Sequence, residues 1–256
     1  MIPALNLFIL RLGKLFFALR SPLTFRALLY RVGASTEHLK ALRNRQFATI
    51  LDVGANRGQF ALLCRTLYPQ ARIVSFEPLP RPANIYRYIF SGDDLVELNQ
   101  TALGAVRGRL DMHVASDDDS SSILEIGRRQ TQAFGTREVE RFPVVVERLD
   151  ELVDGEDLVS PVLLKIDVQG FEAHVLRGAE KLLPAIDAVY VESSFVELYE
   201  GQALFADVWG LVSESGFSMQ GVFNQHCNRA GVPLQADFLF IRAPVKPETE
   251  VAAAAK

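Results

Sequence analysis

The sequence is poor in cysteine. Its two cysteines, Cys64 and Cys227, form neither a CxxC motif nor a Cys/His spacing typical of metal ligands, and they cannot build a disulfide framework. Cys64 falls in a predicted core helix, where a thiol behaves as a small buried hydrophobe. Because few cysteines and no disulfide framework are typical of a reducing compartment, we predict a cytoplasmic protein.

Acidic residues are missing from the start of the chain, and so is a long uninterrupted apolar run. Residues 1–31 carry apolar and basic side chains, and the first acid is Glu37. The segment is too interrupted for a membrane-spanning helix, which needs about 20 apolar residues, and it lacks the charged start and cleavage site of a signal peptide. Two interpretations stay open: a basic amphipathic helix in peripheral contact with a membrane, and a helix that caps the core or forms a dimer contact.

A strong net charge is also absent. The net charge of −4 gives no general attraction to nucleic acid. The length of 256 residues is typical of one domain with an accessory segment. We therefore predict an N-terminal helical accessory segment over 1–45, a main domain over 46–243, and a disordered tail of Pro, Glu and Ala over 244–256. The oligomeric state is not predicted.

The chain is organised around the stretch 49–60, TILDVGANRGQF. An apolar run is followed by a turn between Gly54 and Gly58 and then by an apolar-periodic segment, which predicts a strand, a tight turn and a helix. Such a turn lets backbone N–H groups approach a ligand and directs a helix N-terminus toward it. The next predicted strand, 72–76, ends at Glu77, where an acid can accept hydrogen bonds from both ribose hydroxyls. Together these features predict a nucleoside cofactor.

Two cofactors compete for this turn. The third glycine of the G-x-G-x-x-G pattern is absent, and Asp52 precedes the turn. A carboxylate there would repel the diphosphate of NAD, but it suits the cationic amino group and sulfonium of S-adenosylmethionine. A NAD-dependent oxidoreductase and a strand-to-helix turn without a ligand stay as alternatives.

The rest of the chain alternates strands and helices, which predicts an α/β fold with a mostly parallel sheet covered by helices on both faces. Two further strands, 109–114 and 142–146, interrupt this rhythm as an addition to the sheet. The last two strands, 217–222 and 236–242, are predicted to pair as a hairpin around a loop at 224–233. The other predicted elements are strands at 95–99, 162–167 and 188–191 and helices at 36–45, 58–68, 81–90, 171–183 and 205–215.

Acids end two of the predicted strands. Ligands bind beyond the carboxyl ends of parallel strands, and Asp167 and Glu192 lie at that edge. These carboxylates could accept a proton, bind substrate hydroxyls or share a Mg²⁺ ion. His226 is the histidine that we place near the mouth of a pocket, whereas His38 and His174 fall in helices predicted to lie away from this edge. The candidate catalytic residues are therefore Asp167, Glu192 and His226.

Five segments carry a resemblance to a known family: ILDVGANRGQF, SFEPLP, LLKIDVQGFEAHVLRGAEKLL, VYVESSFVELYEGQ and QADFLFIR. In this order they resemble the FkbM family of S-adenosylmethionine-dependent methyltransferases, over 37–242. The resemblance implies a Rossmann-like class I methyltransferase fold with a seven-stranded sheet and an added β-hairpin. It implies O-methylation of a sugar, glycan or polyketide-type hydroxyl, so the expected partner is a small-molecule or glycan acceptor. Gln169 stands where the family often has an acid, which weakens the case for a metal.

The resemblance also assigns residues. Cofactor contacts carry over onto Asp52, Gly54, Asn56 and Gly58 at the methionine end, Glu77 at the ribose, and Leu103 and Gly104 near the adenine. Ser121 and Ser122 are expected to line the pocket, and Glu197 and Tyr199 to shape the acceptor site. A non-catalytic nucleoside-binding module of the same fold stays as a second alternative to the enzyme.

Overall fold

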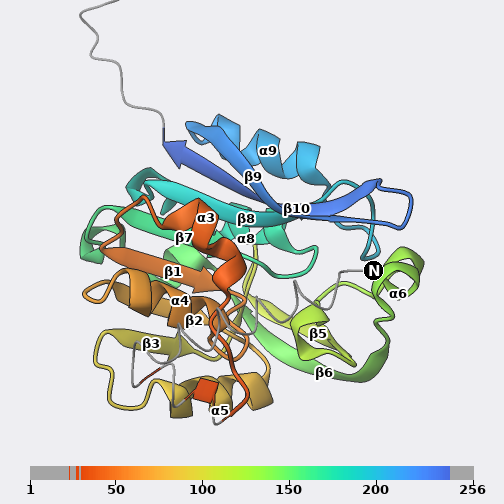
Figure 1. Ribbon diagram of the computed structural model, residues 1–256, viewed down its shortest axis with the longest axis horizontal. Helices are drawn as coiled ribbons and strands as arrows, with labels where there is room; N and C mark the ends of the chain where they lie inside the picture. Colours follow the sequence, from red (N-terminus) through yellow and green to blue (C-terminus); the bar gives the residue numbers. More distant parts are fainter. Residues whose placement is uncertain (1–22, 24–26, 29, 243–256) are drawn as a thin grey trace, which may run out of the picture.

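The computed structural model describes residues 23, 27–28 and 30–242, and a seven-stranded sheet forms its centre (Figure 1). The strand order is β3-β2-β1-β7-β8-β10-β9, with β10 antiparallel to both neighbours and the other pairs parallel. This order confirms the predicted mostly parallel sheet and the pairing of the last two strands. The strands are β1 (Thr49–Val53), β2 (Arg72–Phe76), β3 (Val96–Asn99), β7 (Val162–Ile166), β8 (Ala188–Ser194), β9 (Phe217–Cys227) and β10 (Pro233–Arg242).

Helices cover both faces of this sheet (Figure 1). Side chains alternate along a strand, so Ile50 packs in one core with helices α3, α4 and α5, and Leu51 packs in the other core with α8 and α9. The predicted α/β layers are therefore confirmed, and they follow from the alternation of side chains along each strand. The helices are α3 (Leu39–Leu42), α4 (Gln59–Leu67), α5 (Pro80–Ile89), α6 (Arg128–Phe134), α7 (Leu149–Leu152), α8 (Glu172–Gly178) and α9 (Phe205–Glu214), with short 3-10 turns η1 (Thr36–His38), η2 (Asp118–Ser120), η3 (Gly155–Asp157) and η4 (Leu183–Ala185).

A second, three-stranded sheet contains the two further strands predicted at 109–114 and 142–146, which pair with each other as an added hairpin. Its strands β4 (Ala102–Leu103), β5 (Gly108–Ala115) and β6 (Glu138–Glu147) lie in the order β4-β6-β5. Strands β5 and β6 are antiparallel, and β4, which is too short to be read from the sequence, pairs parallel with β6. Met112 and Val144 form a small core there with Leu79, which precedes α5. The hairpin thereby packs beside the segment that follows β2.

Several predicted boundaries were wrong. Strand β9 continues to Cys227 and β10 begins at Pro233, so half of the predicted 224–233 loop is strand. The polar residues there gave no alternating pattern, yet the paired backbones form a ladder with register shifts, and Asn224 takes a positive φ of 46°. Helix α8 ends at Gly178 rather than at Leu183. The predicted 36–45 helix is a 3-10 turn followed by the short α3.

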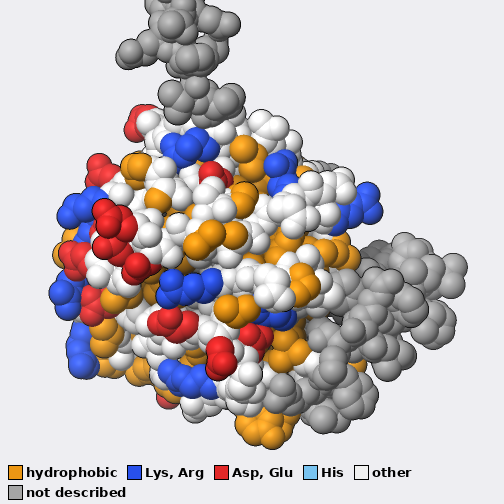
Figure 2. Space-filling model, turned by 90° about the vertical axis from the view of Figure 1, so that its left-hand side faces the viewer, with side chains coloured by type: hydrophobic (Ala, Val, Ile, Leu, Met, Phe, Trp, Pro, Cys, Tyr) orange, Lys and Arg blue, Asp and Glu red, His pale blue; other side chains and the backbone are white. Residues whose placement is uncertain are grey.

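The predicted accessory segment falls largely outside the described residues. Two predictions fall almost entirely on residues that the structure does not describe. They are the membrane contact through residues 1–31, of which only 23, 27–28 and 30–31 are described, and the disordered tail at 244–256. Val32 and Leu42 are buried in the same core as α4. Among the described residues, no helix is both long and apolar enough to cross a membrane. On the face shown in Figure 2, positive and negative side chains are interspersed.

Candidate active site

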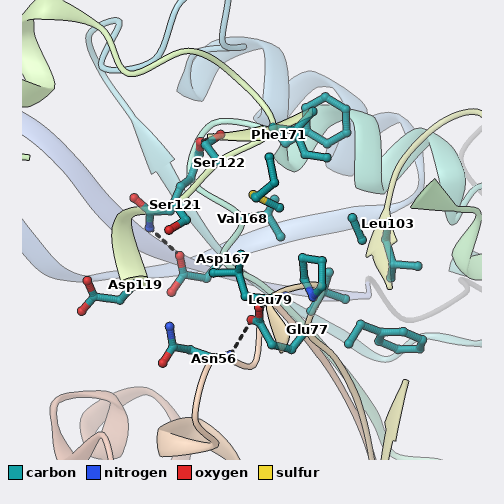
Figure 3. A pocket seen from close by; sticks show the side chains of 18 of the residues that line it. Asn56, Glu77, Leu79, Leu103, Asp119, Ser121, Ser122, Asp167, Val168 and Phe171 are labelled. Carbon is teal, nitrogen blue, oxygen red and sulfur yellow. Dashed lines mark hydrogen bonds between the residues drawn. The ribbon is translucent and has the colours of Figure 1, made fainter. Parts of the chain in front are cut away.

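A first cavity lies at the carboxyl ends of β1, β2 and β7, where the sequence predicted a ligand site. Its two ends differ in character (Figure 3). Asn56, Asp119 and Asp167 line one end, and Leu103 and Phe171 line the other. The cavity is therefore polar near the glycine turn and apolar toward the hairpin. Other apolar lining residues are Phe76, Pro78, Leu79, Met112, Ile123 and Val168.

The glycine turn brings two loops into close contact. Gly54 has a φ of +75°, and a Cβ atom there would lie 1.8 Å from the backbone oxygen of Asp167. Asn56 has a φ of +46°, and its backbone N–H donates to Glu77 Oε2 at 2.9 Å. Both residues line the first cavity. The turn thus allows a ligand to approach the backbone, and only glycine fits at Gly54.

Glu77 is a buried carboxylate on the floor of this cavity. Its Oε1 accepts a hydrogen bond from the N–H of Leu79 at 2.8 Å, and its Oε2 accepts from Asn56. Burial raises its pKa to about 7, and these two backbone hydrogen bonds oppose that shift. A carboxylate has about four acceptor positions, so two are left for a ligand that donates two hydrogen bonds, such as a ribose.

Three residues expected to contact a cofactor do not line the first cavity. Asp52 is fully buried on the α4 side of the sheet, and its Oδ1 lies 3.1 Å from Lys165 Nζ. Gly58, with a φ of +92°, is the N-cap residue of α4, and a Cβ atom there would lie 2.6 Å from the Phe90 ring. Gly104 packs on α8, where a Cβ atom on Gly178 would lie 2.1 Å from the Gly104 oxygen. In the structure, Asp52 forms an ion pair, and Gly58 and Gly104 lie at close packing contacts.

The loop around η2 closes over the glycine turn. Asp118 forms an ion pair with Arg57 and accepts a hydrogen bond from Asn56 Nδ2 at 3.4 Å. Asp119, the next residue, lines the first cavity. Burial, followed by repulsion from Asp118, Asp117 and Asp167, raises its pKa. Asp119 therefore presents an acceptor to the polar end of the cavity.

The two serines line the first cavity as expected, but their hydroxyls also hold the loop. Ser121 Oγ accepts from the N–H of Ala115 at 3.0 Å, and Ser122 Oγ donates to the backbone oxygen of Gln169 at 2.6 Å. The Tyr199 hydroxyl bonds Ser120 O and Gln169 Oε1, each at 2.9 Å. Glu197 is exposed, lines neither cavity and accepts from Gly201 N. Tyr199 thus supports the site from behind, whereas Glu197 only fixes a turn.

A second cavity adjoins the first and shares Asp119, Asp167 and Gln169 with it. Gln169 has a positive φ of 55°, and its Nε2 donates to both Asp167 Oδ1 and Glu192 Oε2 at 2.8 Å. Glu192 Oε1 accepts from Gln235 Nε2 at 2.7 Å. Burial, followed by repulsion from Asp167 and Asp237, raises the pKa of Glu192 well above its ordinary value. The structure therefore brings the two predicted carboxylates together through an amide.

This amide bears on the predicted Mg²⁺ site. The described residues contain no group of three or more His, Cys, Asp or Glu side chains that could hold a metal ion. The Gln169 amide nitrogen bonds an oxygen of each carboxylate. One oxygen of Asp167 and one of Glu192, which could otherwise bind a cation, therefore accept hydrogen bonds from an uncharged amide.

Histidines reach the second cavity from two places. The predicted candidate His226 is exposed on β9, lines the cavity and lies edge-on to Phe134 with ring centroids 6.2 Å apart. His38, which we expected away from the site, also lines it, together with Asp237. Asp237 lies opposite Glu192 on the neighbouring strand. No sequence signal joined His38 to Asp237, because they lie near opposite ends of the chain.

Comparison with known proteins identifies similar sequences. The 2-O-methyltransferase NoeI of Sinorhizobium fredii is 34% identical over 160 residues, which cover 60% of this chain and 66% of NoeI. The hexuronic acid methyltransferase AglP of Haloferax volcanii is 30% identical over 142 residues, 55% of this chain and 54% of AglP. The chain therefore spans less than two thirds of the length of either of these relatives.

A solved structure and a family match complete the comparison. The precorrin-6y C5,15-methyltransferase of Geobacter metallireducens GS-15 superimposes with a TM-score of 0.43 at 10% identity, over 80% of this chain and 84% of that one. The methyltransferase FkbM domain matches residues 52–219, which is more than half of the chain. On that match, the chain belongs to the FkbM family of S-adenosylmethionine-dependent methyltransferases.

Proposed function

We propose that the chain uses S-adenosylmethionine to methylate a hydroxyl of an uncharged, polyhydroxylated acceptor, such as a sugar, bound in the second cavity. The observation that carries this proposal is the junction of two unlike cavities at Asp167 and Gln169. The first combines a glycine turn, a buried acid and an apolar end, and the second is lined mainly by polar side chains. Two adjoining sites of this kind suit transfer from one ligand to another.

The first cavity fits the methyl donor along its length. Leu103, Val168 and Phe171 offer apolar contacts to an adenine, and Glu77 has acceptor positions for the ribose hydroxyls. At the other end, the carboxylates of Asp119 and Asp167 face the cavity and would attract an amino group and a sulfonium. When bound, S-adenosylmethionine supplies an electrophilic methyl group on a positively charged sulfur. The chain's own task is to hold the acceptor oxygen close and in line, which can lower the barrier by several kcal/mol.

The charge of the second cavity supports an uncharged acceptor. Five carboxylates line it, and among the described residues no lysine or arginine does. An anionic sugar would meet repulsion there. Sugar hydroxyls, in contrast, can donate to carboxylates and pair with the amides of Gln169, Asn224 and Gln235. The five carboxylates are Glu37, Asp119, Asp167, Glu192 and Asp237.

The rival oxidoreductase fits these charges less well. The diphosphate of NAD would lie near the glycine turn, where Asp118, Asp119 and Asp167 line the first cavity. Repulsion between these carboxylates and a diphosphate disfavours that cofactor. A non-catalytic module would bind the nucleoside but transfer no methyl group, so turnover separates it from the enzyme.

Methylation assays with matched acceptors test the proposed function. We expect transfer to neutral glycosides, with the corresponding uronic acids at least about tenfold slower, equivalent to about 1.4 kcal/mol of repulsion. The control is Asp167→Asn, which removes a carboxylate from the second cavity while keeping a hydrogen-bond acceptor, and should narrow the rate difference between the neutral glycosides and the uronic acids. Preference for the uronic acid, or binding of NAD in place of S-adenosylmethionine, would contradict the proposal. Assays with and without EDTA test whether Mg²⁺ takes part.

The pKa of Glu77 predicts a pH dependence of cofactor binding. Its value of about 7 in the free protein means that the carboxyl must lose a proton before it can accept two ribose hydrogen bonds. Affinity for S-adenosylhomocysteine, measured by calorimetry, should therefore fall about tenfold from pH 8 to pH 6. Glu77→Gln should bind more weakly and lose this dependence. A wild-type affinity that stays constant between these pH values would contradict the prediction.

A further inference from the structure

A histidine–carboxylate pair lies on the wall of the second cavity. His38, in η1, and Asp237, on β10, both line it. The Nδ1 atom of His38 lies 3.2 Å from Asp237 Oδ2, 2.9 Å from the Tyr190 hydroxyl and 3.1 Å from Asn224 Nδ2. The ring also lies edge-on to Phe60 and Tyr190, each with a centroid distance of 5.5 Å. The orientation of the imidazole is therefore fixed from several sides.

Asp237 is held as a carboxylate. Its Oδ2 accepts from the Tyr190 hydroxyl at 3.0 Å and from Asn224 Nδ2 at 2.7 Å. Burial alone would raise its pKa, but hydrogen bonds from His38, Asn224 and Tyr190 outweigh burial and lower it. A carboxylate beside Nδ1 favours the tautomer with the proton on Nδ1, and the nearby amide of Asn224 then donates to Asp237, its shorter contact. In that tautomer the lone pair of His38 is on Nε2.

The Nε2 atom of His38 is the unused end of this pair. Among the residues that the structure describes, it has no hydrogen-bond partner, and the side chain is 16% exposed. The charged groups around the pair are Glu37 next in the chain, Glu192 opposite Asp237, Asp167 across the cavity, and the buried Asp52–Lys165 pair behind it. Both oxygens of Glu192, in contrast, already accept hydrogen bonds from side-chain amides.

We propose that His38 is the general base of the transferase and that Asp237 is its positioning residue; this inference rests on the proposed function. Nε2 takes the proton of the acceptor hydroxyl as that oxygen forms its bond to the methyl carbon. The electron pair of the broken carbon–sulfur bond goes to the sulfur, which leaves neutral S-adenosylhomocysteine. The imidazolium is stabilised by Asp237 and returns its proton to solvent. Asp167, Gln169 and Glu192 hold the other hydroxyls of the acceptor.

Two substitutions of His38 separate catalysis from structure. In His38→Asn the amide nitrogen can replace Nδ1 and keep the hydrogen bond to Asp237, but nothing replaces Nε2. We expect His38→Asn to fold and to bind S-adenosylhomocysteine within about twofold of wild type, while kcat falls about 10²- to 10⁴-fold. The acid limb of the wild-type kcat–pH profile should disappear. His38→Ala should lose kcat to the same extent and also lose stability.

The outcomes are distinct. A His38→Asn protein that keeps more than about a tenth of the wild-type kcat, or keeps the acid limb, would overturn the assignment and leave His38 a structural contact. If His38→Asn does not fold, Asp237→Asn provides the test, since it should change the tautomer and lower kcat without changing cofactor affinity; an unchanged kcat in Asp237→Asn would overturn the proposal. If wild type binds S-adenosylhomocysteine but methylates no hydroxyl, the proposed function itself fails.

Discussion

Replacing Lys165 with methionine is expected to lower the free energy of unfolding by about 3–5 kcal/mol, because it leaves a buried carboxylate without its partner. Lys165 lies on β7, directly opposite Asp52 on β1. Its Nζ is 3.1 Å from Asp52 Oδ1 and donates to the backbone oxygen of Gly54 at 2.8 Å. Methionine replaces the apolar part of the lysine side chain and lacks its charged ammonium group. Urea unfolding of wild type and variant measures the loss.

The electrostatics explain why this effect is large. Burial by itself lowers the pKa of Lys165, but the carboxylates of Asp52 and then Asp167 outweigh burial and raise it. The carboxylates of Asp52 and Asp167 therefore hold the ammonium in its charged form beneath the cavity. Removing it exposes Asp52, which is fully buried, to the full cost of its own desolvation.

A double variant tests this explanation. Replacing both partners by apolar residues, in Asp52→Leu with Lys165→Met, removes the unpaired charge and should recover at least about half of the loss. The Asp52→Leu single variant, with an unpaired lysine, should be about as unstable as Lys165→Met. If the double variant is no more stable than the two single variants, the ion pair does not explain the loss of stability. The packing of these side chains would then explain it.

The sequence predicted well what depends on local pattern. The turn at Gly54 follows from a glycine between an apolar strand and an apolar helix, and Glu77 follows from the end of the next strand. Both line the first cavity. The convergence of Asp167 and Glu192 also follows, because parallel strands present their carboxyl ends at one edge. Each of these inferences needs only strand order and direction.

What the sequence did not provide is contact between distant segments. Asp52 was expected to face a cation in the cofactor, but the register between β1 and β7 places Lys165 opposite it on the α4 side. That register is set by tertiary packing, which no local pattern encodes. His38 was discounted for the same reason. It approaches the site only because η1 packs near β8 and β10, where His38 contacts Tyr190 and Asp237.

Gln169 shows how a single departure from a family pattern acquires a physical meaning. Its identity alone only weakened the case for a metal. In the structure its side-chain amide nitrogen donates to both Asp167 and Glu192, and its side-chain oxygen Oε1 accepts a hydrogen bond from the Tyr199 hydroxyl. A glutamate there would add a third carboxylate to a cluster in which the pKa of Glu192 is already raised. The amide therefore allows these carboxylates to lie together without a cation between them.

Gly54→Ala is expected to damage both stability and cofactor binding. A left-handed φ at a residue with a side chain costs about 1–3 kcal/mol, and a Cβ atom 1.8 Å from the Asp167 oxygen forces β1 and the loop after β7 apart. Overpacking of this kind adds about 1–3 kcal/mol. Because both loops line the first cavity, affinity for S-adenosylhomocysteine should fall more than about tenfold, or 1.4 kcal/mol.

The matched control for this prediction is Gly135→Ala. Gly135 has nearly the same φ, +78° against +75°, but no atom lies within 4 Å of the position of its Cβ. It should lose only the conformational part, about 1 kcal/mol of unfolding free energy, and bind S-adenosylhomocysteine like wild type. If the two variants lose equal stability and Gly54→Ala still binds normally, backbone conformation alone explains the glycine at position 54. If Gly54→Ala loses more unfolding free energy than Gly135→Ala and also binds S-adenosylhomocysteine more weakly, the close approach of β1 and the Asp167 loop explains the glycine at position 54.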